Sequence, residues 1–441
     1  MEKYDVVIIG SGVGGLTAAY ALHAVGKSVA VIENNLWGGT CPNRGCDPKK
    51  VLLSGVEARD RVNQLQKKGF NELPPMKWKE IEAFKRTFTD PVSDSRKSGF
   101  AAAGIMTFEG TATFIDETHI QVDEQIIEGK QFLLATGQRP ALLPIEGKEY
   151  LKTSTDFLSL AEMPKTVVFI GGGYISFELA TIAQAAGANV HIIHHNQKPL
   201  KAFDASLVKE LVKQVESRGI TVHLDTEVKK ITKKEKEYFL ELTQGTLVTD
   251  LVFSAAGRIP NCEELHLENA HVVYDAKGIL VDTYLRTTNP AIYACGDVLK
   301  KNVPKLTPVA IFEAAYVAKV MSDEVHEPIH YPSIPTIVYG SPKLAQVGVT
   351  TQEAEKSSLY TIERKDMTDW FTYSRINEPI AQATLIYTAE NKLVGASLLS
   401  SQADELINYL ALVIDQKITS KQIEQMIMGY PTVASDLDYL L

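Results

Sequence analysis

An apolar run from Tyr4 to Ile9 opens the chain and ends at a group of glycines. A parallel strand that is covered on both faces has such a continuous run, rather than alternating apolar and polar positions. The residues that follow the glycines, LTAAYALHAVG, have a helical pattern, and a second apolar run, SVAVIE, ends at Glu33. The order of strand, turn, helix and strand predicts a parallel α/β unit.

The glycines of the first turn stand at Gly10, Gly12 and Gly15. In a dinucleotide-binding turn the first glycine allows the tight bend, the second lets the backbone approach the pyrophosphate, and the third lets helix and strand pack closely. The helix N-terminus then offers N–H groups to the phosphates, and Glu33 can accept from the ribose 2′-hydroxyl. This stretch therefore predicts a dinucleotide site.

The same pattern returns after Lys165 to Ile170, where Gly171, Gly172 and Gly173 follow the apolar run and Ser176 replaces the third glycine. Each half also contains a later glycine turn, ATGQRP in the first and AAGRIP in the second. An internal duplication with two nucleotide sites is the interpretation that this repetition favours.

The second half has a histidine where the first has an acid, because Gly10 to Glu33 and Gly171 to His194 both span 23 positions. An acid repels a 2′-phosphate, whereas imidazole and lysine accept one. His194, His195, Lys198 and Lys201 therefore favour NADPH over NADH. The alternative is that these side chains form a solvated turn.

Composition narrows the partners of this 441-residue chain. The formal charge of -9 gives no basic excess, so nucleic acid and anionic membrane surfaces are not expected partners. No apolar run reaches the roughly 20 residues of a membrane span. The N-terminus lacks the pattern of a signal peptide, so we expect a cytoplasmic protein.

Two of the four cysteines, Cys41 and Cys46, stand close together in GGTCPNRGCDPKK. A disulfide over so short a loop contributes only roughly 2 kcal/mol, so redox cycling explains the pair better than stabilisation does. Nearby basic residues and a helix N-terminus favour thiolates. We predict no metal site, since a zinc site needs four ligands, and we interpret Cys262 and Cys295 as small buried residues.

In combination, GxGxxG, GGTCxxxxCxPKK, ATGxxP, GGGYIxxE, AAGRxPN and YACGD resemble the class I pyridine nucleotide-disulfide oxidoreductases. Glutathione reductase, dihydrolipoamide dehydrogenase and mercuric reductase belong to this family. The resemblance covers almost the whole chain. It implies an α/β protein with two Rossmann-like dinucleotide-binding domains, one for FAD and one for NAD(P), and a C-terminal α+β interface domain that forms a homodimer.

The resemblance also implies the domain boundaries and the residues at the cofactors. The FAD domain would comprise 1–149 and 265–326, the NAD(P) domain 150–264 and the interface domain 327–441. Glu33 would bind the FAD adenosine, Asp297 the ribityl chain and Thr307 the flavin pyrimidine edge, while Tyr174 would gate the nicotinamide pocket. Further residues of the cofactor sites would be Thr40, Thr136, Gly137, Gly171, Gly173, Ile175 and Gly257.

The mechanism that the resemblance implies has two halves. NAD(P)H reduces FAD, and the flavin reduces the disulfide of Cys41 and Cys46. Cys46 would be the flavin-facing thiolate and Cys41 the thiol that attacks the substrate. Lys49 would lie near the flavin and pair with Glu178.

Departures from the family pattern bear on the substrate. Tyr430 stands where disulfide reductases of this class have the histidine of HPTxxE, and no histidine follows His330. Tyr430 either donates a proton or only lines the pocket. Tyr20 and Ala315 replace the arginines that recognise glutathione, and the C-terminal tail lacks the cysteine pair of mercuric reductases. The remaining acceptors are an unusual low-molecular-weight disulfide or a small oxidant such as a hypohalous acid or a quinone.

Two other functions stay open at this point. One is an NAD(P)H oxidase, diaphorase or quinone reductase whose flavin reacts directly. The other is a redox-responsive FAD/NAD(P) sensor that acts on a partner.

Overall fold

The computed structural model describes residues 2–441, which form two compact units. The first unit contains the chain up to Lys50, Ala83–Ala141 and Arg258–His330, and the second contains Val51–Glu82, Leu142–Gly257 and Tyr331–Leu441. The second unit groups a dinucleotide fold with the C-terminal sheet, so the three-domain boundaries expected from the sequence stay a prediction. In the described chain, no helix is long and apolar enough to cross a membrane.

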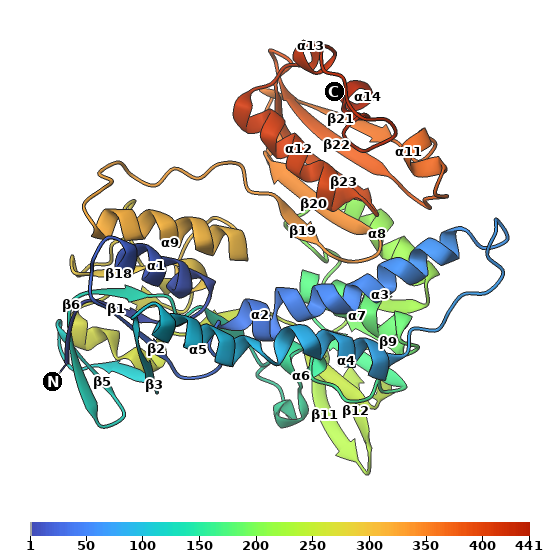
Figure 1. Cartoon of the computed structure of the whole chain (residues 1–441). Helices are drawn as coiled ribbons and strands as arrows, with labels where there is room; N and C mark the ends of the chain where they lie inside the picture. The colour runs from blue at the N-terminus through green and yellow to red at the C-terminus, as the bar shows by residue number, and fades with distance from the viewer. Residues whose placement is uncertain (1) are drawn as a thin grey trace. The chain divides into compact units, whose positions relative to one another are not determined.

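A seven-stranded sheet forms the centre of the first unit (Figure 1). β1 pairs in parallel with β2 and β6, and four of its residues, Val6 to Ile9, are buried, as expected for a strand covered on both faces. The strand order is β3 (Met106–Glu109), β2 (Val29–Glu33), β1 (Glu2–Ile9), β6 (Gln125–Leu134), β5 (His119–Val122) and β4 (Ala112–Phe114).

A late segment completes this sheet, because β18 (Ile292–Ala294) pairs in parallel with β6. Two helices that are distant in sequence pack together beside it, α1 (Val13–Ala24) and α9 (Thr307–Met321) (Figure 1). The remaining elements of this part are α2 (Thr40–Arg44), α5 (Val92–Ala102), β7 (Gln138–Pro140), β15 (Arg258–Pro260), η2 (Glu263–Leu265), η3 (Leu267–Ala270), β16 (Tyr274–Asp275), β17 (Gly278–Ile279) and η4 (Gly296–Val298). Two helices cross the boundary between the units, α3 (Cys46–Gln64) and α4 (Trp78–Thr89).

The second unit repeats the parallel arrangement. Its four-stranded sheet has the order β10 (Ile220–His223), β9 (Asn189–Ile193), β8 (Thr166–Ile170) and β14 (Leu251–Ser254), with all neighbours parallel. α7 (Tyr174–Ala185) follows β8 as α1 follows β1, and α8 (Ala205–Ser217) precedes β10. An antiparallel sheet is formed by β11 (Val228–Lys234), β12 (Glu237–Leu242) and β13 (Thr246–Thr249), and short helices occupy Lys148–Tyr150 (η1) and Ser154–Phe157 (α6).

The C-terminal part of the second unit is an antiparallel sheet covered on one face by α12 (Ala403–Gln416) (Figure 1). Its order is β19 (Thr336–Val338), β20 (Lys343–Gly348), β23 (Leu393–Ser400), β22 (Gln382–Thr388) and β21 (Tyr360–Asp366). Short helices complete it at α10 (Thr351–Ala354), α11 (Phe371–Ser374), α13 (Ser420–Ile423) and α14 (Leu437–Leu440). The mixed, mainly parallel sheet of the first unit, the parallel sheet of the second and this α+β part have the fold class that the sequence predicts.

Candidate redox site

Of the three glycines in the first turn, only Gly12 borders open space that a ligand could occupy. Gly10 has a φ of +104°, and a Cβ there would lie 2.4 Å from the carbonyl oxygen of Ala135. A Cβ on Gly15 would lie 1.9 Å from the Gly10 oxygen, so close packing excludes a side chain. A Cβ on Gly12 would meet only the Cα of Gly39, at 3.9 Å. This open space at the N-cap of α1, which no side chain caps, fits a phosphate group.

Glu33 closes the turn from the end of β2. Its Oε2 accepts from the backbone N–H of Ser11 at 2.9 Å and from the Ser11 hydroxyl at 2.7 Å. The residue lies at the C-terminal end of its strand, where the sequence places a ribose-binding acid. The contact orients the carboxylate, and its role toward FAD stays a prediction.

The second turn, in the other unit, reproduces these contacts with different residues. Gly171 has a φ of +125°, and a Cβ there would lie 2.3 Å from the Ala255 oxygen. Ser176, which replaces the third glycine, donates its hydroxyl to the Gly171 oxygen at 2.5 Å. Gly173 caps α7 without a side-chain bond, and the nearest atom to its added Cβ would be 4.0 Å away. This turn also leaves room for a phosphate.

His194 takes the place of Glu33 in this second turn. Its Nδ1 accepts from the backbone N–H of Gly172 at 3.1 Å, and its Nε2 lies 3.2 Å from the carbonyl oxygen of Lys198, to which it donates. Burial lowers the pKa of His194. The ring is therefore neutral and its two nitrogens are used within the turn, which does not fit the cationic phosphate contact that the sequence suggests. His195, Lys198 and Lys201 are exposed.

The cysteine segment lies directly against the first turn. Gly38 and Gly39 have φ values of +92° and +69°, and a Cβ on Gly39 would lie 2.6 Å from the Cα of Gly12. Asn43 donates to the carbonyl oxygens of Trp37 and Gly39 and so holds α2 in place. α2 begins at Thr40, which brings the segment that contains Cys41 beside the space above Gly12.

Cys46 is the first residue of the 19-residue helix α3, and Cys41 lies on α2. Both are half-buried thiols. A hydrogen bond from Cys41 lowers the pKa of Cys46 to about 6, with further help from Lys49, Thr307 and Lys50 against the effect of burial. The same hydrogen bond and burial raise the pKa of Cys41. These opposite directions favour Cys46 as the thiolate and Cys41 as the thiol, and their roles in catalysis stay a prediction.

Thr307 brings a second helix N-terminus to the Cys46 sulfur. Its Oγ1 lies 3.7 Å from the Cys46 Sγ, and it is the first residue of α9, whose N-cap Leu306 offers no side-chain bond. Unpaired N–H groups and the helix dipole at this point favour negative charge. The contact joins two of the residues that the sequence predicts for the redox centre.

A buried ion pair contacts the backbone of the segment that contains Asp297. Glu313 on α9 accepts from the backbone N–H of Gly296 at 2.7 Å and pairs with Lys301 at 2.6 Å. Lys305 donates to the Asp297 carbonyl at 2.8 Å. Glu313 is not among the residues that the sequence patterns predict. A charged residue within the otherwise apolar run of α9 was the available signal, because such a residue needs a buried partner.

The segments that follow the two later glycine turns pair in the first unit. β7 and β15 pair antiparallel, and Thr136 donates its hydroxyl to the Asn261 oxygen at 2.7 Å. Gly137 in this unit has a φ of +67°, and no atom lies within 4 Å of the Cβ that it would carry. Gly257, with a φ of +136° and the same open surroundings, ends a segment of the second unit.

Four further residues predicted for the active site or the cofactor sites belong to the second unit. Glu178 is 1% exposed on α7, and its Oε1 accepts from the backbone N–H of Tyr339 at 2.8 Å. Tyr174 and Ile175 begin α7, and Tyr174 is 44% exposed. Tyr430 is 68% exposed and stacks on Phe371 with ring centroids 5.9 Å apart. Their expected roles beside Lys49 and Cys41, which lie in the first unit, stay predictions.

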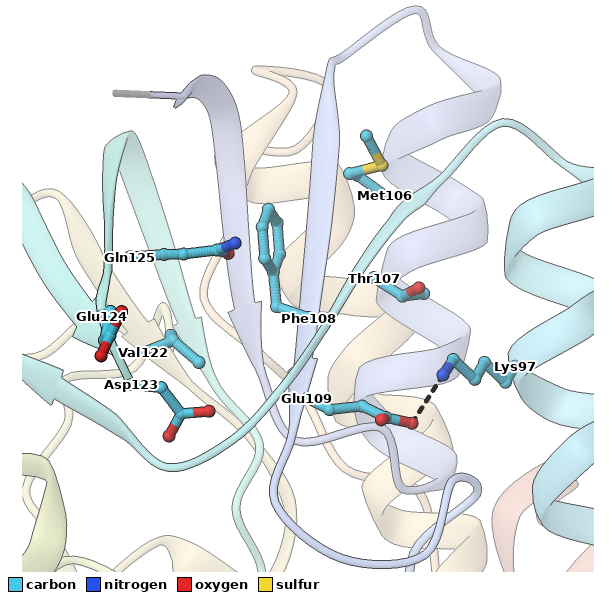
Figure 2. A pocket seen from close by; sticks show the side chains of 9 residues that line it. All are labelled: Lys97, Met106, Thr107, Phe108, Glu109, Val122, Asp123, Glu124 and Gln125. Carbon is cyan, nitrogen blue, oxygen red and sulfur yellow. Dashed lines mark hydrogen bonds and ion pairs between the residues drawn. The ribbon is translucent and has the colours of Figure 1, made fainter.

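A pocket of about 540 Å³ opens elsewhere in the first unit, beside the edge strand β3 (Figure 2). Lys97 and Glu109, two of the charged residues that line it, pair with each other at 2.6 Å, and Glu109 also accepts from the Trp37 indole. None of the predicted site residues lines this pocket. Among residues 2–441, no cluster of three or more His, Cys, Asp or Glu side chains has a geometry that could hold a metal ion.

Comparison with known proteins identifies the family of this chain. Residues 4–314 match the model of the pyridine nucleotide-disulphide oxidoreductase family, and residues 334–440 match its dimerisation domain. The chain belongs to this family. It is therefore an NAD(P)H-dependent flavoprotein oxidoreductase that acts on sulfur groups, with binding sites for a flavin and a pyridine nucleotide.

Several family members resemble the chain along its full length. Glutathione reductase from Burkholderia cepacia is 29% identical, with 99% of this chain and 98% of the relative covered. Mercuric reductase from Staphylococcus aureus is 30% identical, with 98% and 81% covered. A solved structure, the HOCl-induced flavoprotein disulfide reductase RclA from Escherichia coli, matches with a TM-score of 0.90 at 25% identity, with 99% of each chain covered. Its Cu(II) complex matches equally well, with a TM-score of 0.90 and 100% and 99% covered.

The geometry of the chain fits the flavin that this family uses. The open space at Gly12, the thiolate-favouring position of Cys46 and the uncapped N-terminus of α9 all belong to the first unit. A bound flavin would supply two-electron transfer between the nicotinamide and the cysteine pair. The protein's own residues would hold the phosphates, keep one sulfur ionised and keep the other protonated.

Proposed function

We propose that this enzyme uses NADPH and FAD to reduce the Cys41–Cys46 disulfide, and that Cys41 then reduces a small thiol-reactive oxidant or an unusual low-molecular-weight disulfide. The observation that carries the proposal is the asymmetry of the pair. Cys46 has a pKa of about 6 and faces Thr307, while the pKa of Cys41 is raised. One sulfur is suited to the flavin side and the other to the substrate side.

The proposed electron acceptor follows from two observations: residues of known substrate sites that are missing here, and the solved structures that the chain resembles. Tyr20 and Ala315 stand where glutathione reductases carry arginines, which argues against glutathione disulfide. Similarity to an HOCl-induced disulfide reductase, and to its Cu(II) complex, supports a role with strong oxidants or with Cu(II) as an acceptor. A hypohalous acid needs little acid catalysis, which suits a site with Tyr430 in the place of histidine.

NADPH is the proposed reductant because of the exposed basic groups after β9. The neutral His194 shapes the turn, and His195, Lys198 and Lys201 would meet the 2′-phosphate. Without an acid at the end of β9, no carboxylate repels that phosphate. NADH would bind through the same turn with fewer charge contacts.

We also propose that the enzyme is a homodimer that associates through its C-terminal part. The match to the family's dimerisation domain supports this. Exposed apolar side chains in the C-terminal part, of which Phe371 and Tyr430 stack on each other, support it further, since large exposed apolar patches mark interaction sites. These side chains are Phe371, Met426, Ile427, Tyr430 and Tyr439. Sedimentation velocity should give a dimer for the wild type and a monomer for Phe371→Asp/Ile427→Asp.

Anaerobic titration with NADPH tests the redox centre. Two-electron reduction should give a long-wavelength thiolate-to-flavin absorption band, which Cys46→Ser abolishes and Cys41→Ser keeps. Cys262→Ser, a change at a buried cysteine outside the pair, is the matched control and should keep the band. A band that survives in Cys46→Ser would contradict the assignment.

Stopped-flow reoxidation of the NADPH-reduced enzyme identifies the acceptor. The panel contains disulfides, quinones, Cu(II), Hg(II), oxygen and hypochlorous acid. Under the proposal, Cys41→Ser loses reactivity toward disulfides and hypochlorous acid. Near-normal turnover of Cys41→Ser with quinones or oxygen as the fastest acceptors would instead favour a diaphorase or an oxidase. Negligible turnover with every acceptor would favour the sensor function.

A further inference from the structure

A carboxylate lies beside the thiol that is proposed to attack the substrate. The Cys41 Sγ–H donates to Oδ1 of Asp47, with the two atoms 3.8 Å apart. Cys41 is half-buried on α2, and Asp47 is an exposed residue in the first turn of α3. Both residues belong to the first unit, and each lies on a helix.

Few groups near Cys41 can accept its thiol proton. The groups that act on it are Cys46, Thr307 and Asp47, while Lys49 and Lys50 act on Cys46. The hydrogen bond with Cys46, burial and the Asp47 carboxylate hold the pKa of Cys41 above its ordinary value. Cys41 therefore carries a proton in the reduced enzyme, and that proton must leave when the sulfur attacks.

The C-terminal part of the chain offers no imidazole to receive this proton, since no histidine follows His330. The carboxylate of Asp47 lies 3.8 Å from the Cys41 sulfur, within hydrogen-bond reach of the same proton that the Cys46 sulfur attracts. Its exposure gives it direct exchange with solvent and with a leaving group outside the site. The arrangement has the geometry of a general base, which must lie within hydrogen-bond reach of the proton that it removes.

We propose that Asp47 is a catalytic residue, the proton acceptor and donor for Cys41. The inference rests on the proposed function. Cys41 attacks a disulfide R–S–S–R′, the Cys41–S–R bond forms, the S–S′ bond breaks, and the thiol proton moves to Asp47. Asp47 returns this proton to the leaving R′S⁻. The Cys46 thiolate then attacks Cys41, the Cys41–Cys46 bond forms, and RS⁻ leaves and takes its proton from solvent.

A purely structural role makes a different prediction. Acids in the first turn of a helix are favoured by the helix dipole, and Asp94 likewise lies in the first turn of α5 in the same unit. If Asp47 only stabilised α3, its replacement by asparagine would not change the reactivity of Cys41 with pH. If Asp47 accepts and donates the proton, Asp47→Asn should raise the alkylation rate of Cys41 and lower the rate at which a disulfide reoxidises the enzyme.

The first measurement is alkylation of Cys41 by iodoacetamide in the two-electron-reduced enzyme, followed by peptide mass spectrometry from pH 5 to 10. Asp47→Asn removes the smallest of the contributions that raise the pKa of Cys41, so we expect a modest rise in alkylation at neutral pH. The isosteric change keeps the size of the side chain. Asp47→Glu should restore the wild-type profile in part, and Asp94→Asn should leave it unchanged.

The second measurement is reoxidation of the reduced enzyme by two disulfides. Hydroxyethyl disulfide releases a basic alkanethiolate that needs the proton, whereas Ellman's reagent releases a weakly basic aromatic thiolate. We expect Asp47→Asn to slow reoxidation by hydroxyethyl disulfide at least about 100-fold, the lower range of general acid–base effects. Ellman's reagent should be affected much less.

Equal reoxidation rates for Asp47→Asn and wild type with hydroxyethyl disulfide would overturn the inference. A loss of both alkylation and reoxidation would also overturn it, because it would show that the change blocks access to Cys41. Formation of the thiolate-to-flavin band by NADPH monitors the proposed function separately. Asp47→Asn should form this band at the wild-type rate, and absence of the band in the wild type would reject the proposed function itself.

Discussion

The Sγ of Cys46 lies 3.7 Å from the Oγ1 of Thr307, a residue 261 positions later in the chain. The contact brings together the first residues of two helices, α3 and α9. Both helix ends favour negative charge at the same sulfur. This relationship explains why one cysteine of the pair is suited to remain a thiolate in the reduced enzyme.

The first prediction concerns the titration of Cys46. Since its pKa is lowered to about 6, the thiolate dominates above pH 6 and is protonated below it. The thiolate-to-flavin band of the reduced enzyme should therefore disappear as the pH falls through about 6. Spectrophotometric titration of the two-electron-reduced enzyme measures this midpoint. A midpoint near 8.5, the value of an unperturbed cysteine, would show that the site does not stabilise the thiolate.

The second prediction isolates the contribution of Thr307. Thr307→Val keeps the shape of the side chain and removes the hydroxyl that can donate to the sulfur. A hydrogen bond to a charged group contributes about 1.5 to 3 kcal/mol, so the Cys46 pKa should rise by about one unit or more. The same titration gives the shift. Thr307→Ser, which retains the hydroxyl, should titrate like the wild type.

The third prediction concerns the preference for NADPH. Lys198→Glu/Lys201→Glu replaces two exposed basic groups after β9 with acids. Because charge contacts with a phosphate are lost and repulsion is introduced, KM for NADPH should rise at least about tenfold, while KM for NADH changes little. Lys209→Glu on α8 makes the same type of change farther along the chain and should leave both KM values near wild type. Equal effects on both nucleotides would argue against a 2′-phosphate site here.

The fourth prediction separates the two kinds of glycine in the first turn. Gly15→Ala places a Cβ 1.9 Å from the Gly10 oxygen and should prevent stable folding of the first unit. Gly12→Ala finds open space, so the apoprotein should fold normally. Its Cβ nevertheless occupies the space proposed for the FAD pyrophosphate. Thermal unfolding of the apoproteins and FAD titration by fluorescence quenching should therefore show a folding defect in one variant and a binding defect in the other.

The fifth prediction concerns the buried pair of Glu313 and Lys301. Glu313 is fully buried and Lys301 nearly so, and breaking a buried pair from one side costs about 3 to 5 kcal/mol. Glu313→Ala should therefore lower the melting temperature by several degrees. Glu313→Leu/Lys301→Met removes both charges and should lose less than the sum of the two single changes. Additive losses would show that the two side chains do not depend on each other.

Local sequence patterns were sufficient for the strands, the glycine turns and the cysteine pair. β1 and β8 lie where the apolar runs predict them, because a strand buried on both faces needs such a run regardless of its partners. The requirements for Gly10 and Gly15 are also local, since they concern bends and packing within one strand–turn–helix unit. The order of the motifs along the chain was enough to indicate the family.

Other features depended on contacts between distant segments. His194 has the position of a cationic phosphate ligand in the sequence, but burial and two hydrogen bonds make it a neutral part of the turn. The pairing of β18 with β6 and the burial of Glu313 likewise join segments that are far apart. Protonation states and buried pairs depend on local dielectric and on partners in space, which a linear pattern does not contain.

By itself, the sequence determined the two glycine turns, the closely spaced cysteine pair and the missing histidine, because these follow from residue types at short spacings. Only the tertiary structure decided the asymmetry between Cys41 and Cys46. That asymmetry comes mainly from the hydrogen bond between the two sulfurs, with Lys49 and Lys50 acting on Cys46 and the Asp47 carboxylate acting on Cys41. The charge on a thiol depends on the groups within a few ångströms of it, and folding selects those groups.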